Sequence, residues 1–296
     1  MTQSQSPSLE RRANGADAKA RAELRAICAG DALWRHMREE ASAALALEPS
    51  MTPLLVGAIL NCASFAEAIV RRVSARLGAP ALPAQMIADA FHEALEADPA
   101  IVEAFRADLT AVVERDPACG RLIDPFLYFK GFHAICAHRL AHWLWRGGRM
   151  DFALYLQSRS SEVFQTDIHP AARFGSGTFL DHATGLVVGE TAVVEDDVSI
   201  LQNVTLGGSG KESGDRHPKV QRGVLIGAGA KILGNIRIGS CTRIAAGSVV
   251  LRDTPSNVTM AGVPAKIIGP AGCAEPARDM DQLLSELAYD AFNYVI

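Results

Sequence analysis

The chain has 296 residues, of which 49% are hydrophobic and 21% charged, so it can bury a core and is not a disordered polyelectrolyte. Its net charge of −4 argues against a protein that binds the nucleic-acid backbone. The apolar stretch 54–60 is too short to span a bilayer, and residues 1–20 lack the apolar region of a secretory signal. The six cysteines form no CxxC pair, which indicates reduced thiols. We therefore expect a cytoplasmic protein that binds neither nucleic acid nor membrane.

The first half of the chain has the pattern of helices. Apolar residues recur at helical spacing over 85–97 and again over 101–113. Three Asp-Pro pairs and the pair Gly147-Gly148 are typical of helix starts and of a helix end. These signals predict a helical domain over 21–165, preceded by a disordered N-terminus over 1–20.

The second half repeats every six residues instead. The apolar repeat positions are Ile168, Phe174, Leu180, Leu186, Ala192, Val198 and Val204, then Val220, Ile226, Ile232, Ile238, Ile244 and Val250. A period of six cannot stay on one face of an α-helix and is typical of a parallel β-helix. The step from Val204 to Val220 is not a multiple of six, so we expect a ten-residue excursion within the loop 205–219. The prediction is an α+β chain with a β-helix over 166–270 and a C-terminal tail over 271–296.

Several motifs of this half point to one family. They are DIHPAA (167–172), LDHATG (180–185) and GDRHPK (214–219), with DPAC (116–119) and KGFHA (130–134) in the helical half. On these motifs the chain resembles bacterial serine O-acetyltransferases from residue 116 to 269. The resemblance implies a left-handed parallel β-helix, and transfer of an acetyl group from acetyl-CoA to L-serine for cysteine biosynthesis. It also implies a homohexamer built as a dimer of trimers, with active sites between neighbouring β-helices. We expect no metal.

The reaction needs a general base, because a protonated serine hydroxyl is a poor nucleophile. The β-helix half contains three histidines, at 169, 182 and 217. The resemblance implies that His182 is the base and that Asp167 orients its imidazole, as a carboxylate does in a catalytic triad. The spacing of the two residues along the chain does not itself pair them.

Four more residues are candidates for serine binding. The resemblance implies that Arg216 binds the serine carboxylate, with His217 beside it, because a guanidinium can make a bidentate contact. It also implies that Asp116 and Asp181 bind the ammonium group. Asp116 equally fits a helix N-cap before Pro117. Glu190, in VGETAV, is typical of the family near the site, with no role that we can assign.

Acetyl-CoA needs a groove in which its pantetheine arm can approach the backbone. The resemblance implies that Gly207, Gly208, Ala228 and Ala246 line this groove, and that Lys266 reaches a phosphate. The Gly208 N–H is a candidate oxyanion donor. Small residues equally fit the tight corners that every coil of a β-helix requires.

Four alternatives stand beside this interpretation. His138 and His142 have a metal-like i, i+4 spacing without an evident third ligand, and the three β-helix histidines lack the close pair of a γ-type carbonic anhydrase. The chain could instead acetylate a sugar or antibiotic hydroxyl. It could also be a non-catalytic scaffold, but it retains His182 and Asp167.

The last segment, 271–296, carries five acidic residues against one arginine and ends in Tyr294-Val295-Ile296. Such a segment is by itself typical of a frayed terminus. An apolar C-terminal residue on an acidic tether also suits capture of the terminal carboxylate by another protein. The resemblance implies that Ile296 enters the active site of O-acetylserine sulfhydrylase.

Overall fold

The computed structural model describes residues 31–210 and 213–283, in two compact units, 1–61 and 62–296. The described part of the first unit contains α2 (Asp31–Leu47), the 3-10 turn η1 (Pro49–Met51), α3 (Thr52–Leu55) and the π-helical turn η2 (Val56–Leu60). In this unit the Arg38 side chain donates to the carbonyl of Leu60 at 3.0 Å, which ties α2 to η2.

The second unit begins with six helices, which are α4 (Phe65–Leu77), α5 (Ala84–Ala97), α6 (Ala100–Arg115), α7 (Ile123–Tyr128), α8 (Lys130–Arg146) and α9 (Met150–Phe164). Local signals set their ends: Ser64 accepts a hydrogen bond from the Glu67 N–H at the start of α4, and Gly147 caps α8. No helix of the described residues is long and apolar enough to cross a membrane.

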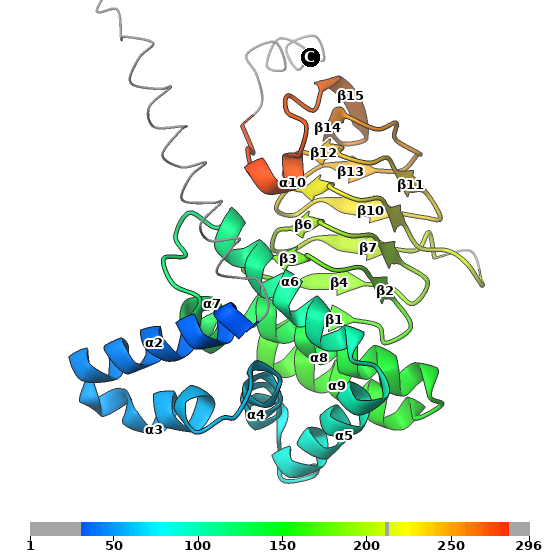
Figure 1. Ribbon diagram of the computed structural model, residues 1–296. Coiled ribbons are helices and arrows are strands. Elements are labelled where there is room, and N and C mark those ends of the chain that lie inside the picture. The colour runs from blue at the N-terminus through cyan, green and yellow to red at the C-terminus, as the bar shows by residue number, and fades with distance from the viewer. Residues whose placement is uncertain (1–30, 211–212, 284–296) are drawn as a thin grey trace, which may run out of the picture. The chain divides into compact units, whose positions relative to one another are not determined.

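Short strands then wind into a parallel β-solenoid with three faces (Figure 1). The five-stranded sheet contains β1 (Thr166–Ile168), β4 (Leu186–Val188), β7 (Thr205–Gly207), β10 (Lys231–Leu233) and β13 (Val249–Val250). The four-stranded sheet contains β2 (Arg173–Phe174), β5 (Val193–Val194), β8 (Lys219–Val220) and β11 (Arg237–Ile238). The six-stranded sheet contains β3 (Phe179–Leu180), β6 (Ser199–Ile200), β9 (Leu225–Ile226), β12 (Arg243–Ile244), β14 (Val258–Gly262) and β15 (Ala265–Pro270), the last antiparallel to β14. The predicted α+β class, helices followed by a parallel β-helix, is confirmed.

The coils of the solenoid differ in length. On the five-stranded sheet Ile168 pairs with Val188, Val188 with Leu206, and Leu206 with Ile232. The step from Val188 to Leu206 is the regular coil of three hexads. The first coil is longer than this by two residues, which enter at the turn 181–185, and the coil that ends at Ile232 is longer by the eight residues of the excursion loop. The expected ten-residue excursion is therefore wrong by the two residues of that first turn.

A count in sixes conceals this turn because each hexad has two inward positions, two residues apart. Leu186 and Val188 are both buried, at 1% and 2% exposure, and so are Val204 and Leu206. Counting six residues from Leu180 leads to Leu186, whereas the residue that continues its row is two residues later. Both residues are apolar, so the count alone does not show the difference. From Leu186 onward the first predicted run is thus two residues before the positions that pair with Ile168, Phe174 and Leu180.

Helix α8 packs directly on the first coil. A Cβ at Gly131 would lie 2.0 Å from the carbonyl oxygen of Leu180, so only glycine lets the helix backbone come this close. His138 and His142 donate ring N–H groups to the carbonyls of Ala172 (3.1 Å) and Pro170 (2.8 Å). These contacts attach α8 to the first coil, and the helices α4–α9 and the solenoid belong to one compact unit.

The outer faces of two sheets are covered differently. The outward row of the six-stranded sheet is buried to 8% exposure or less at Phe179, Ser199, Leu225, Arg243 and Thr259. Helix α6 covers its start, and the segment that follows β15, with α10 (Pro276–Asp279), covers the rest (Figure 1). The outward row of the five-stranded sheet is partly or fully exposed at Asp167, Val187, Thr205, Lys231 and Val249.

Candidate active site

The turns from the six-stranded to the five-stranded sheet stack along one edge of the solenoid, which we call the first edge. It consists of 181–185, 201–204, 227–230 and 245–248. Backbone hydrogen bonds join successive turns, from Asn203 N–H to Thr184 O (2.7 Å) and from Gly247 N–H to Ala228 O (2.8 Å). The structure therefore brings His182, Ala228 and Ala246, three of the predicted residues, into one column.

The turn 181–185 that carries His182 is an unusual one. His182 and Ala183 have φ angles of 52° and 59°, in the left-handed region that residues other than glycine rarely adopt. Gly185 N–H donates to Gln165 O at 2.8 Å, and the Lys130 ammonium donates to Gln165 Oε1 and Thr184 Oγ1. These bonds hold the turn in place while 75% of the His182 side chain remains exposed.

Two carboxylates lie beside this turn. Asp181 Oδ1 is 3.8 Å from His182 Nε2. Burial raises the pKa of the Asp181 carboxyl; the imidazole opposes this shift, and the charge of Asp116 adds to it. Asp116 is the C-cap residue directly after α6, and its Oδ1 accepts a hydrogen bond from the N–H of Ala118 at 2.8 Å. No helix starts at Pro117, so the N-cap alternative for Asp116 is wrong, and the paired carboxylates suit a ligand ammonium group.

Asp167 occupies the middle of β1 on the outer face of the five-stranded sheet. Its Oδ1 accepts a hydrogen bond from Gln157 Nε2 at 2.6 Å. Among residues 31–210 and 213–283, no ion pair joins Asp167 to His182, and the imidazole lies next to Asp181 instead.

Arg216, His217 and Gly208 lie on a second edge, formed by the turns from the five-stranded to the four-stranded sheet. It consists of 169–172, 189–192, 208–218 and 234–236. Arg216 donates through one terminal nitrogen to Glu190 Oε2 (2.8 Å) and through the other to Gly214 O (3.0 Å). The hydrogen bond from Arg216 lowers the pKa of Glu190. Glu190 therefore holds the guanidinium, a role that its sequence motif alone did not reveal.

His217 lies against the same edge, almost fully buried. A Cβ at Gly189 would lie 2.0 Å from His217 Nε2, so glycine is required there. The Thr191 N–H donates to His217 Nδ1 at 3.2 Å, which leaves the proton of the neutral ring on Nε2. Burial lowers the pKa of His217 and favours this neutral form. The ring presents a donor next to Gly208, where a Cβ would be 3.5 Å from Nε2.

Three predicted residues fall elsewhere. Gly207 is the last residue of β7, directly before the second edge, and Lys266 is exposed on β15. Ile296 lies outside the described residues. In the described part of the chain, no group of three or more His, Cys, Asp or Glu could hold a metal ion.

The two edges of one chain stand apart. The outer face of the five-stranded sheet lies between them, and its three-residue strands span about 10 Å at the usual rise per residue. His182 and Arg216 of one chain therefore lie on opposite sides of this face. One chain thus carries two half-sites, one with an acid pair and an imidazole, the other with a guanidinium.

The comparisons with known proteins identify the family of the chain. A model described as the N-terminal region of serine acetyltransferase matches residues 33–137, and a bacterial transferase hexapeptide model matches 217–252. A serine acetyltransferase of Salmonella typhimurium is 50% identical over 262 residues, which are 88% of this chain and 96% of that protein. The chain belongs to the serine acetyltransferase family.

Solved structures of serine acetyltransferases agree with this assignment. The enzyme of Brucella abortus in complex with coenzyme A is 61% identical, with a TM-score of 0.82, over 83% of this chain and 98% of that one. The enzyme of Neisseria gonorrhoeae in complex with serine is 52% identical, with a TM-score of 0.77, over 79% of this chain and 96% of that one. The serine acetyltransferase and hexapeptide models together include Asp116, His217, Ala228 and Ala246.

Proposed function

We propose that the chain transfers the acetyl group of acetyl-CoA to the hydroxyl of L-serine, giving O-acetylserine, with His182 as the general base. The observation that carries this proposal is the exposed imidazole on a lengthened turn, flanked by Asp181 and Asp116. The serine hydroxyl gives its proton to His182 as its oxygen bonds to the acetyl carbon. The carbon–sulfur bond then breaks, and the imidazolium returns the proton to the coenzyme A thiolate.

Charged side chains bind the ammonium and carboxylate groups of the substrate serine. Asp116 and Asp181 bind the ammonium group, while Arg216, held by Glu190, binds the carboxylate with His217 beside it. The likeness to a structure in complex with serine supports an amino acid as acceptor. Asp167 orients His182 once the exposed imidazole turns toward the five-stranded sheet. Asp167 lies close along the chain to Gln165, to which the turn is bound.

The acyl donor occupies the first edge. Ala228 and Ala246 follow His182 along this column, and their small side chains leave room for the pantetheine arm beside the backbone. Lys266 is the exposed cation for a phosphate, and the N–H of Gly208, with Gly207 before it, is the oxyanion donor. The likeness to a structure in complex with coenzyme A supports acetyl-CoA as the co-substrate.

The active enzyme is an oligomer in which the first edge of one chain meets the second edge of the next. The separation of the two half-sites supports this arrangement, and such a head-to-tail contact closes into a ring. We propose trimers of this kind, paired into a cytoplasmic homohexamer. Co-assembly of two variants tests this arrangement. His182→Asn and Arg216→Ala chains, each with low activity when assayed alone at a serine concentration below the parent KM, should regain up to about a quarter of the parent sites after random co-assembly. Sites within one chain would give no recovery.

The reaction is tested by thiol release. Release of free coenzyme A from acetyl-CoA should require L-serine, and the product should be O-acetylserine by mass spectrometry. Release that depends instead on a sugar or an aminoglycoside hydroxyl would overturn the assignment of the acceptor.

We also propose that the C-terminal tail binds O-acetylserine sulfhydrylase through Ile296. The acidic composition of 271–296 and its terminal isoleucine support this mode. Calorimetry with the sulfhydrylase of the same organism should detect binding by the full chain. A chain that lacks only Ile296 should bind far more weakly, and equal binding would refute the anchor.

A further inference from the structure

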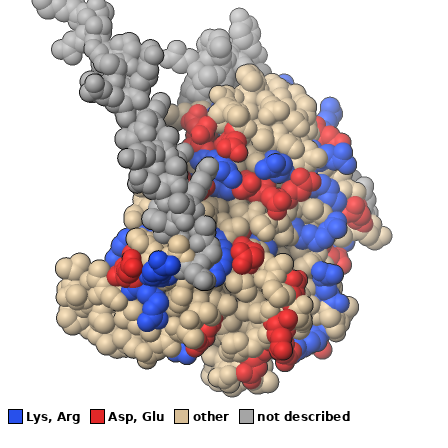
Figure 2. All heavy atoms as spheres, in the orientation of Figure 1, with Lys and Arg blue, Asp and Glu red and all other residues tan. Residues whose placement is uncertain are grey.

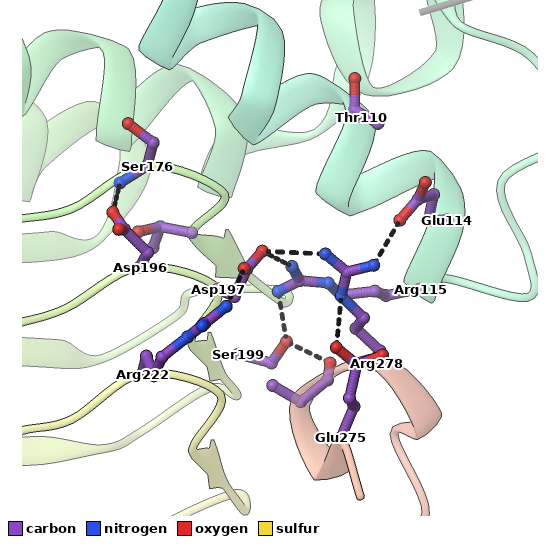
Figure 3. Close-up of polar contacts among 12 residues, drawn as sticks. Thr110, Glu114, Arg115, Ser176, Asp196, Asp197, Ser199, Arg222, Glu275 and Arg278 are labelled. Atoms are coloured by element: carbon purple, nitrogen blue, oxygen red, sulfur yellow. Dashed lines mark hydrogen bonds and ion pairs between the residues drawn. The ribbon is translucent and has the colours of Figure 1, made fainter. Parts of the chain in front are cut away.

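The C-terminal end of α6 is fixed to the solenoid by a buried guanidinium. Arg115 is the last residue of α6, and its side chain is only 1% exposed. One terminal nitrogen donates to Ser199 Oγ at 3.1 Å and the other to Asp197 Oδ1 at 3.0 Å (Figure 3). Both partners belong to the second coil, whereas the residue that follows Arg115 is Asp116.

Three arginines converge on the Asp197 carboxylate (Figure 3). Arg115 reaches it from α6, Arg278 from α10 (3.4 Å), and Arg222 from the neighbouring coil (3.4 Å). Arg222 is 65% exposed and joins one coil of the solenoid to the next. Arg115 and Arg278 instead attach separate elements to the solenoid.

The C-terminal segment completes the anchor of Arg115. The hydroxyl of Ser199, fully buried, accepts from Arg115 and donates to the carbonyl of Ala277 at 2.7 Å. The N–H of Ala277 donates in turn to Gly223 O at 3.3 Å. A chain of hydrogen bonds therefore runs from the solenoid through the C-terminal segment to the end of α6.

We infer that Arg115 is a positioning residue for Asp116, and that the segment 275–281 strengthens its hold through Ser199. This inference rests on the proposed function, in which Asp116 and Asp181 share the ammonium group of serine. The carboxylates of Asp116 and Asp181 repel each other until the serine ammonium group binds. The position of Asp116, at the end of a helix, must therefore be fixed by other contacts. Arg115 supplies this restraint one peptide bond from Asp116.

The apolar contact of α6 does not replace this anchor. Ala111 and Val112 pack on Phe179, which fixes the helix axis upstream of its last residues. The carboxylate of Asp116 extends beyond that contact, in a turn stabilised by its own bond to the Ala118 N–H. The Arg115 side chain, by contrast, ties the end of the helix directly to the second coil.

The test compares the Michaelis constants of four variants in the full-length enzyme. Arg115→Lys keeps the charge but loses the forked contact, and it should raise the KM for serine about tenfold, as expected for loss of a buried charged hydrogen bond. The KM for acetyl-CoA should stay within about twofold. Ser199→Ala should raise the serine KM in the same direction by less. Arg222→Ala is the matched control on the same carboxylate and should change neither constant.

Asp116→Asn separates failure of this inference from failure of the proposed function. If Asp116→Asn raises the serine KM but folded Arg115→Lys and Ser199→Ala do not, Arg115 is structural only and the inference is overturned. An equal rise for both substrates would show general loosening and overturn it as well. If Asp116→Asn itself leaves the serine KM unchanged, the role of Asp116 fails, and this inference fails with it. Hexamer size and circular dichroism confirm folding, and Ser199→Ala keeps the test valid if Arg115→Lys does not fold.

Discussion

The six-stranded and five-stranded sheets share one apolar axis, but the outer face of the first is buried and the outer face of the second is exposed. The six-stranded sheet has an outward row from Phe179 to Thr259 that is buried under α6 and the C-terminal segment. The five-stranded sheet has an outward row in which Val187 is 40% exposed. On the face drawn in Figure 2, acidic and basic side chains are interspersed over the solenoid. The repeat places apolar residues in the inward rows of both sheets. The two faces therefore differ only in their outward residues, which determine whether a face is covered or exposed.

This difference assigns separate tasks to the two faces. The covered sheet attaches the helices and the C-terminal segment, so substitutions there should cost stability. The open sheet separates the two half-sites, so substitutions on its edges should cost turnover or substrate affinity with little loss of stability. Four predictions test this division.

The largest effect should come from His182 on the first edge. His182→Asn should lower kcat by about 10²- to 10⁴-fold, the usual contribution of a general base. Asparagine tolerates the left-handed backbone at φ 52°, so the turn and the thermal unfolding midpoint should be preserved. Steady-state thiol release and scanning calorimetry measure the two quantities. A kcat near that of the parent would remove His182 from the role of base.

The covered face should show the largest loss of stability. Phe179→Ala should lower the free energy of unfolding by about 3–5 kcal/mol, because it leaves a cavity beneath α6. Val187→Ala on the open face should cost less than about 1 kcal/mol. Urea denaturation at equal chain concentration compares them. Equal losses would contradict the division between the faces.

On the second edge, Arg216→Ala should raise the KM for serine by about 10- to 100-fold, as expected when a charge-assisted contact is lost. The KM for acetyl-CoA should change little, because Arg216 contacts only the amino-acid carboxylate. Initial-rate kinetics with each substrate varied gives both constants. Parallel increases would indicate a collapsed loop around Glu190.

The smallest effect should be the pH dependence contributed by Asp181. Its folded pKa is raised mainly by burial, so the folded state binds more protons than the unfolded state above pH 3.8, and stability falls as pH rises through the folded pKa. Asp181→Asn should flatten this fall in melting temperature and be more stable than the parent above that range. Asp89→Asn, at an exposed carboxylate, is the control. The same slope in parent and Asp181→Asn would show that Asp181 does not carry it.

Much of the fold follows from the sequence, because the spacing of apolar residues reports helices and the solenoid axis directly. The lengthened turn 181–185 could not be seen, since Leu186 and Val188 are both apolar and conceal the slip. The partnership of Glu190 with Arg216 was equally hidden, because it crosses the excursion loop between two coils. The resemblance implied the residues of both half-sites and active sites between neighbouring β-helices, whereas the edge of the solenoid that carries each residue is known only from the strand pairing.

The C-terminal segment contains a helix that no sequence pattern indicated. The sequence predicted one tail over 271–296, whereas residues 276–279 form α10, in which Pro276 and Ala277 are buried against the solenoid. This segment has too few apolar residues to show a period. Single polar contacts fix its position on the solenoid, such as the hydrogen bond from Arg243 to Asp281 (3.0 Å). Contacts of this kind join residues far apart in the sequence and leave no local pattern.

The two additional residues at 181–185 show how such a scaffold gains new chemistry. Strands must keep their rows so that apolar side chains stack along the axis, and an extra residue inside a strand would turn its neighbours outward. A corner can lengthen without moving the strands on either side, as the pairing of Ile168 with Val188 demonstrates. Corners are thus the places where loops can be grafted or exchanged, and enzymes with new acceptors should be sought by redesigning 181–185 and 208–218 while the coils are left intact.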